Sequence, residues 1–111
     1  MIDQVRPSQL PDWIQAQGGN AVVLDVREPA ELATASIQAE GFELVRIPMM
    51  DVPVRIAELD AGRPVAVLCH HGARSQRVAQ FLAGQGFDTI ANIAGGIDAW
   101  SQERDASVPR Y

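Results

Sequence analysis

Short apolar runs alternate with amphipathic stretches along the chain. The first run, AVVLDV, is nearly continuous and contains β-branched residues. A run of this kind is typical of a strand that is buried on both faces, as in a parallel sheet. A proline ends the second run, ELVRIP, which is also typical of a strand end. The pattern predicts strands over residues 21–26, 43–48, 63–69 and 88–96.

Helical periodicity fills the intervals between these runs. Ser8 is predicted to cap a first helix, and Leu10, Trp13 and Ile14 fall on one face of it. The C-terminal tail, residues 105–111, is expected to cover part of the protein surface or to fray. Further helices are predicted over residues 28–35, 52–59 (with Asp51 as its cap), 75–86 and 97–103.

Strands that alternate with helices at short spacing indicate one α/β domain with a parallel sheet between helix layers. The domain is expected to span residues 1–111, with its core at about 7–102. Ligands of such sheets bind beyond the carboxyl ends of the strands. The loop that begins at Cys69 follows a predicted strand, so it is expected to lie at such an end.

Composition narrows the function classes. The chain has 111 residues and a net charge of −5, and all nine of its basic residues are arginines. Without lysine, Schiff-base chemistry is excluded, and the acidic balance argues against nucleic-acid binding. One cysteine cannot form an intramolecular disulfide. The chain has no apolar run long enough to span a membrane and no signal peptide, so a cytoplasmic protein is expected.

The segment CHHGARS, residues 69–75, holds the chain's one cysteine and both of its histidines. Residues 61–87 contain no acidic side chain, although the chain has fourteen elsewhere, and Arg74 is among the three arginines in this window. A turn from a strand into a helix directs backbone N–H groups inward, where they stabilise an anion. The segment therefore predicts a site for a thiolate or an oxyanion.

Less specific interpretations of these residues remain open. Cys69 could be a small buried apolar residue, the histidines ordinary loop residues and the arginines solvated charges. Zinc is disfavoured because no further cysteine or histidine completes a site. Cysteine phosphatases use a Cys-x5-Arg loop, whereas Cys69 and Arg74 are separated by four residues. The tighter ring favours a sulfur atom carried on the cysteine over a phosphoryl group.

Three motifs together resemble the rhodanese family in its single-domain bacterial form. LDVREPAE (24–31) is similar to the family's first signature, CHHGARS (69–75) to its active-site loop, and GGIDAW (95–100) to its closing signature. The resemblance covers about residues 7–102. It implies a three-layer fold, in which a five-stranded parallel sheet is flanked by helices.

The resemblance also implies roles. Cys69 would be the nucleophile that holds a persulfide, and Arg74 would help to bind an anionic donor. Asp25 and Arg27 would support the fold near the site, and Trp100 would pack in the core. The family's Gly-His-Ile continuation is absent, because residues 35–37 read Ala-Ser-Ile. The loop around the extra sulfur would consist of His70, His71, Gly72, Ala73, Arg74 and Ser75.

The function expected from this resemblance is sulfur transfer by a monomer without a metal or cofactor. Cys69 would take a sulfane sulfur from thiosulfate or a similar anion and pass it to cyanide, a thiol or a protein thiol. One alternative is a persulfide carrier with little turnover of small molecules. A phosphatase or arsenate reductase on the same fold is a more remote alternative.

Overall fold

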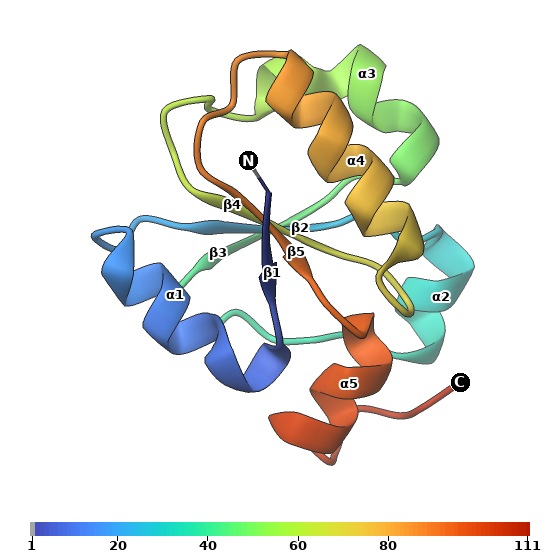
Figure 1. The fold of residues 1–111 in the computed structure, drawn as a ribbon. Helices are drawn as coiled ribbons and strands as arrows, with labels where there is room; N and C mark the ends of the chain where they lie inside the picture. The colour runs from blue at the N-terminus through green and yellow to red at the C-terminus, as the bar shows by residue number, and fades with distance from the viewer. Residues whose placement is uncertain (1) are drawn as a thin grey trace.

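The computed structural model describes residues 2–111, in which five parallel strands form one sheet in the order β1-β5-β4-β2-β3. The expected architecture is confirmed (Figure 1). Four of the strands lie within the predicted runs. The strands are β1 (Ile2–Val5), β2 (Val22–Asp25), β3 (Glu43–Arg46), β4 (Val65–Leu68) and β5 (Ile90–Ile93).

Helices cover both faces of the sheet and produce two apolar cores. Leu10 of α1 and Trp100 of α5 pack with Val23 on one face, whereas Val52 of α3 and Leu82 of α4 pack on the other. Trp100 is therefore a core residue, as predicted. The helices are α1 (Leu10–Ala16), α2 (Pro29–Thr34), α3 (Val52–Arg55), α4 (Ala73–Gly84) and α5 (Gly96–Glu103).

β1 was not anticipated from the sequence. The segment IDQV places two polar residues between two apolar ones, so it lacks the apolar run that marks β2 and β4. It pairs with β5 through the register Gln4↔Asn92 at the edge of the sheet, where exposed polar residues are tolerated. Its strand conformation therefore follows from a neighbour about 90 residues away in the chain.

Of the two predicted helix caps, Ser8 was wrong, whereas Asp51 does occupy the N-cap position of α3. Ser8 lies inside a 3-10 turn, Pro7–Gln9, and its hydroxyl donates to Glu103 at 2.9 Å. Asp51 directly precedes α3, but its backbone is helical (φ −91°, ψ −11°) and its side chain makes no capping hydrogen bond. The helix predicted over 52–59 is reduced to α3, with a 3-10 turn on each side, Met49–Asp51 and Ile56–Glu58.

Candidate active site

The loop 69–72 connects β4 to α4 at the carboxyl end of the sheet, where the alternation of strands and helices placed it. Gly72 has a φ of +110°, a left-handed conformation that favours glycine, and α4 begins directly after it, at Ala73. Side chains alternate between the faces of β4. Cys69 consequently points to the α4 side and packs in that core, with 1% of its surface exposed.

Two groups contact the sulfur of Cys69. The backbone N–H of Gly72 donates to Sγ at 3.0 Å, and the hydroxyl oxygen of Ser75 lies 3.2 Å from Sγ. Ser75 belongs to the first turn of α4 and is fully buried. An N–H donor and the positive end of a helix both favour negative charge on the sulfur. The geometry therefore suits a cysteine that acts as a nucleophile.

Arg74 forms an ion pair with Glu31, a carboxylate that lies outside the segment 61–87, which has no acidic residue. Its guanidinium donates to both carboxylate oxygens of Glu31 in α2, at 2.6 and 2.8 Å. These hydrogen bonds lower the pKa of Glu31 to about 2, and they raise the pKa of Arg74. Local sequence could not show this contact because 43 residues separate the partners.

Replacing Glu31 by Gln is expected to make the free energy of unfolding depend less on pH in the acidic range. Glu31 titrates near 2 when folded and near its usual 4.5 when unfolded, so its ion pair stabilises the fold fully above about pH 5. The contribution is lost as the pH falls from 4.5 toward 2. At pH 7 we expect the variant to lose about 1 kcal/mol. Urea unfolding at pH 7, 4 and 2 measures the difference, and a constant difference at all three would contradict the assignment.

Asp25 and Arg27 form a buried ion pair at the carboxyl end of β2. Arg27 Nη2 donates to Asp25 Oδ2 at 2.7 Å, and both side chains are almost completely buried. Arg27 Nη1 also donates to the backbone oxygen of Ala35 at 2.8 Å. The segment 35–37, where the resemblance implies Gly-His-Ile, is therefore held here through its backbone. The pair joins β2 to the chain that leaves α2.

The tail over 105–111 covers the loop. The ring of His70 is stacked between those of His71 and Tyr111, with centroids 3.9 Å away on each side. The Tyr111 hydroxyl donates to Glu31 at 2.7 Å and lies 3.2 Å from Nη1 of Arg27. Nothing in the local sequence around Tyr111 indicated this contact, although the tail had been expected to cover part of the surface.

The closing motif holds the loop from the side of α5. The amide of Ile97 donates to the backbone oxygen of Cys69 at 2.9 Å, and that of Asp98 to the oxygen of His70 at 3.2 Å. Gly96, with a φ of +60°, packs directly against these carbonyl groups. A Cβ atom at Gly96 would lie 2.3 Å from the oxygen of His70. The motif therefore requires glycine where two backbone segments meet.

Replacing Gly96 by Ala is expected to destabilise the protein by about 3 kcal/mol or more, because the new methyl group meets rigid backbone in a strained conformation. The loop should shift as well, which would change the reactivity of Cys69. Gly84→Ala is the matched control: its Cβ would have no neighbour within 4 Å, so it should be neutral or stabilising by up to about 1 kcal/mol. Equal melting temperatures for the two variants would refute the argument.

Asn92 is a second functional candidate that the sequence pattern did not indicate. It is a buried polar residue in the apolar strand β5, and its amide lies between Ser75 and Gly72. A lone polar residue within a predicted buried strand was the available signal.

Residues 2–111 contain no group of three or more His, Cys, Asp or Glu side chains placed to hold a metal ion, and no helix in this range is long and apolar enough to cross a membrane.

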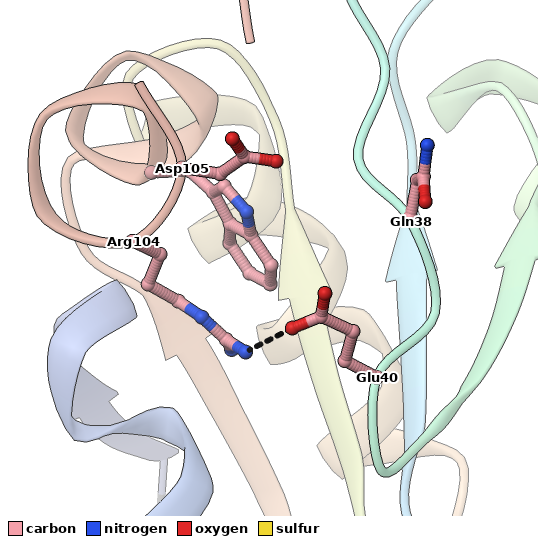
Figure 2. Close-up of a pocket in the computed structure, with 5 residues that line it drawn as sticks. Gln38, Glu40, Arg104 and Asp105 are labelled. Carbon is pink, nitrogen blue, oxygen red and sulfur yellow. Dashed lines mark ion pairs between the residues drawn. The ribbon is translucent and has the colours of Figure 1, made fainter. Parts of the chain in front are cut away.

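A cavity of about 260 Å³ lies away from Cys69, beside α5 (Figure 2). Trp100 belongs to the core on the opposite face of the sheet from Cys69. Arg104 pairs with Glu40 across the cavity at 3.6 Å. Its lining residues are Gln38, Glu40, Trp100, Arg104 and Asp105. Cys69 and the residues of its loop are not among them, so the cavity is separate from the cysteine site.

Comparisons with known proteins agree with this geometry. A family model described as a rhodanese-like domain matches residues 7–103. A protein of Allochromatium vinosum named sulfurtransferase is 30% identical over 102 residues, which cover 92% of this chain and 91% of that protein.

Two further proteins are similar to this chain, one in sequence and one in structure. An Arabidopsis thaliana protein named rhodanese-like/PpiC domain-containing protein 12, chloroplastic, is 39% identical over 93 residues; the match covers 82% of this chain but 30% of that protein. The crystal structure of a rhodanese-related protein from Thermoplasma volcanium has a TM-score of 0.76 and 30% identity, and the match covers 98% of this chain and 99% of that one.

Proposed function

The chain belongs to the rhodanese-like domain family, and from this membership we propose that it is a sulfurtransferase that carries sulfur as a persulfide on Cys69. The observation that supports this most directly is the hydrogen bond that the Gly72 N–H donates to Sγ at 3.0 Å, just before α4 begins. The name of the Allochromatium vinosum relative, sulfurtransferase, supports the same reaction class.

The proposed reaction is a double displacement. The Cys69 thiol first loses its proton to solvent. The thiolate then attacks the sulfane sulfur of thiosulfate, the S–S bond of the donor breaks, and sulfite leaves with the bonding electron pair. In the second half, cyanide or an acceptor thiolate attacks the outer sulfur of the persulfide. Thiocyanate or a new persulfide leaves and the Cys69 thiolate returns, so that the cycle needs no oxidant or reductant.

Arg74 is proposed to stabilise the anionic donor while Glu31 holds its guanidinium in place. The ion pair neutralises part of the positive charge of Arg74. If Arg74 were unpaired, its full positive charge would help to stabilise the leaving sulfite. Because Arg74 is paired, the loop N–H groups have to supply a larger share of that stabilisation. The short Cys-x4-Arg loop argues for this chemistry and against phosphatase or arsenate reductase activity.

Intact-mass measurement tests the proposal. Incubation with thiosulfate should add one sulfur atom to the protein, and excess cyanide should remove it. The variant Cys69→Ser should gain nothing under the same conditions. Folded protein with a free thiol that gains no sulfur would exclude thiosulfate as the donor. The same measurement with mercaptopyruvate and with a protein persulfide would then distinguish another donor from a carrier that exchanges sulfur only with proteins.

A further inference from the structure

Asn92 is a buried polar residue on the same side of the sheet as Cys69. It is 4% exposed, and its neighbours in β5 are apolar and buried. Asn92 is paired in register with Val67, two residues before Cys69, so both side chains point toward α4. A buried amide in this position needs hydrogen-bond partners, and it finds them in the groups that surround the sulfur.

The partners of the Asn92 amide determine its orientation. Its Nδ2 donates to the backbone oxygen of Gly72 at 3.2 Å and to Gln4 Oε1 at 2.9 Å. The carbonyl of Gly72 can only accept, so the nitrogen must face it and Oδ1 must face the hydroxyl of Ser75. Because Oδ1 also only accepts, Ser75 donates its single hydrogen to Asn92.

This arrangement assigns the proton between Cys69 and Ser75. With the Ser75 hydrogen directed at Asn92, the Ser75 oxygen presents a lone pair to Sγ at 3.2 Å. The thiol therefore donates its S–H to Ser75. Once the thiol ionises, either the thiolate faces this lone pair, or Ser75 turns toward the sulfur and leaves the buried Oδ1 of Asn92 without a donor. Both outcomes disfavour the thiolate.

We propose that Asn92 is a positioning residue that controls the ionisation of Cys69 through Ser75. It holds the Ser75 hydroxyl away from the sulfur and so favours the protonated thiol over the bare thiolate. A persulfide carries no proton on Sγ and leaves the hydrogen bond from Ser75 to Asn92 intact. Asn92 thereby protects the cysteine between turnovers. This role rests on Cys69 as the reactive group of the proposed function.

The pH profile of iodoacetamide alkylation tests the proposal, because iodoacetamide reacts with the thiolate and the chain has one cysteine. Asn92→Leu frees Ser75 to donate to the thiolate. We expect the midpoint of the profile to fall by about one pH unit, a tenfold change in the ratio of thiolate to thiol. In a Ser75→Ala background the same substitution should leave the midpoint unchanged, because the group through which Asn92 acts is absent.

Further variants separate this role from a structural one. Gln4→Leu removes the other acceptor of the Asn92 amide, and the midpoint should stay at its wild-type value. Asn92→Asp adds a negative charge and should raise the midpoint. The charged or titratable groups on the loop, on α4 and α5 and in the contacts described around them are the same in all variants: Arg6, Asp25, Arg27, Glu31, His70, His71, Arg74, Arg77, Asp98, Glu103 and Tyr111.

An unchanged midpoint in folded Asn92→Leu would overturn the proposal, as would an equal shift with and without Ser75. If Asn92→Leu does not fold, Asn92→Asp decides alone, and a midpoint that does not rise would overturn it. Alkylation does not depend on sulfur transfer. If thiosulfate does not transfer sulfur to Cys69, the alkylation midpoints can still be measured and compared. The two proposals can therefore fail separately.

Discussion

Cys69→Ser is expected to abolish sulfur transfer, with turnover reduced about a thousandfold or more, as when other enzymes lose a covalent nucleophile. Serine is not ionised near neutral pH, and its oxygen cannot take the place of the sulfur that the loop holds next to the Gly72 N–H. The formation of thiocyanate from thiosulfate and cyanide, followed at saturating concentrations of both, measures the loss.

The fold of Cys69→Ser should survive, so that the loss can be attributed to chemistry. Ser75 lies close enough to offer the new hydroxyl a hydrogen-bond partner in this buried position. We expect a melting temperature within a few degrees of the wild type. Turnover at the wild-type rate in this variant would mean that the nucleophile is not Cys69, and the proposed mechanism would have to be abandoned.

Arg27→Met is expected to give the largest loss of stability among the charged residues discussed. It leaves the carboxylate of Asp25 buried at 1% exposure without its partner, which costs about 3–5 kcal/mol. It also removes the donor to the backbone oxygen of Ala35. A domain of this size has a total stability of roughly 5–15 kcal/mol, so the variant should unfold at a much lower urea concentration.

Arg55→Met is the matched control, because Arg55 forms an exposed ion pair with Glu58 at 2.7 Å. Exposed pairs of this kind contribute little, since water screens both charges. The urea midpoint should therefore hardly change. A second comparison is Arg27→Met combined with Asp25→Asn, which should recover part of the loss because no buried charge remains unpaired. Equal effects of Arg27→Met and Arg55→Met would show that the buried pair has no special role.

Local patterns in the sequence were sufficient to predict four of the five strands and the loop that carries Cys69. The apolar runs of β2 and β4 indicated burial on both faces, and the alternation with helices indicated parallel strands. Spacing in CHHGARS and the glycines of GGIDAW indicated the family, and the comparison confirmed it. The strands, the loop and these motifs could be predicted because they depend on residues that are close in sequence and on which side chains are buried.

Tertiary structure decided which groups meet at the sulfur. Glu31 reaches Arg74, Asn92 reaches Ser75 and Tyr111 stacks on His70, and each contact joins distant parts of the chain. Periodicity reports whether a side chain is buried, but the identity of its partner depends on strand register and on how helices pack over the sheet. The charge at Arg74 and the proton position near Cys69 therefore follow from the assembled fold, because electrostatic and hydrogen-bond contacts depend on distance in space and not on separation along the chain.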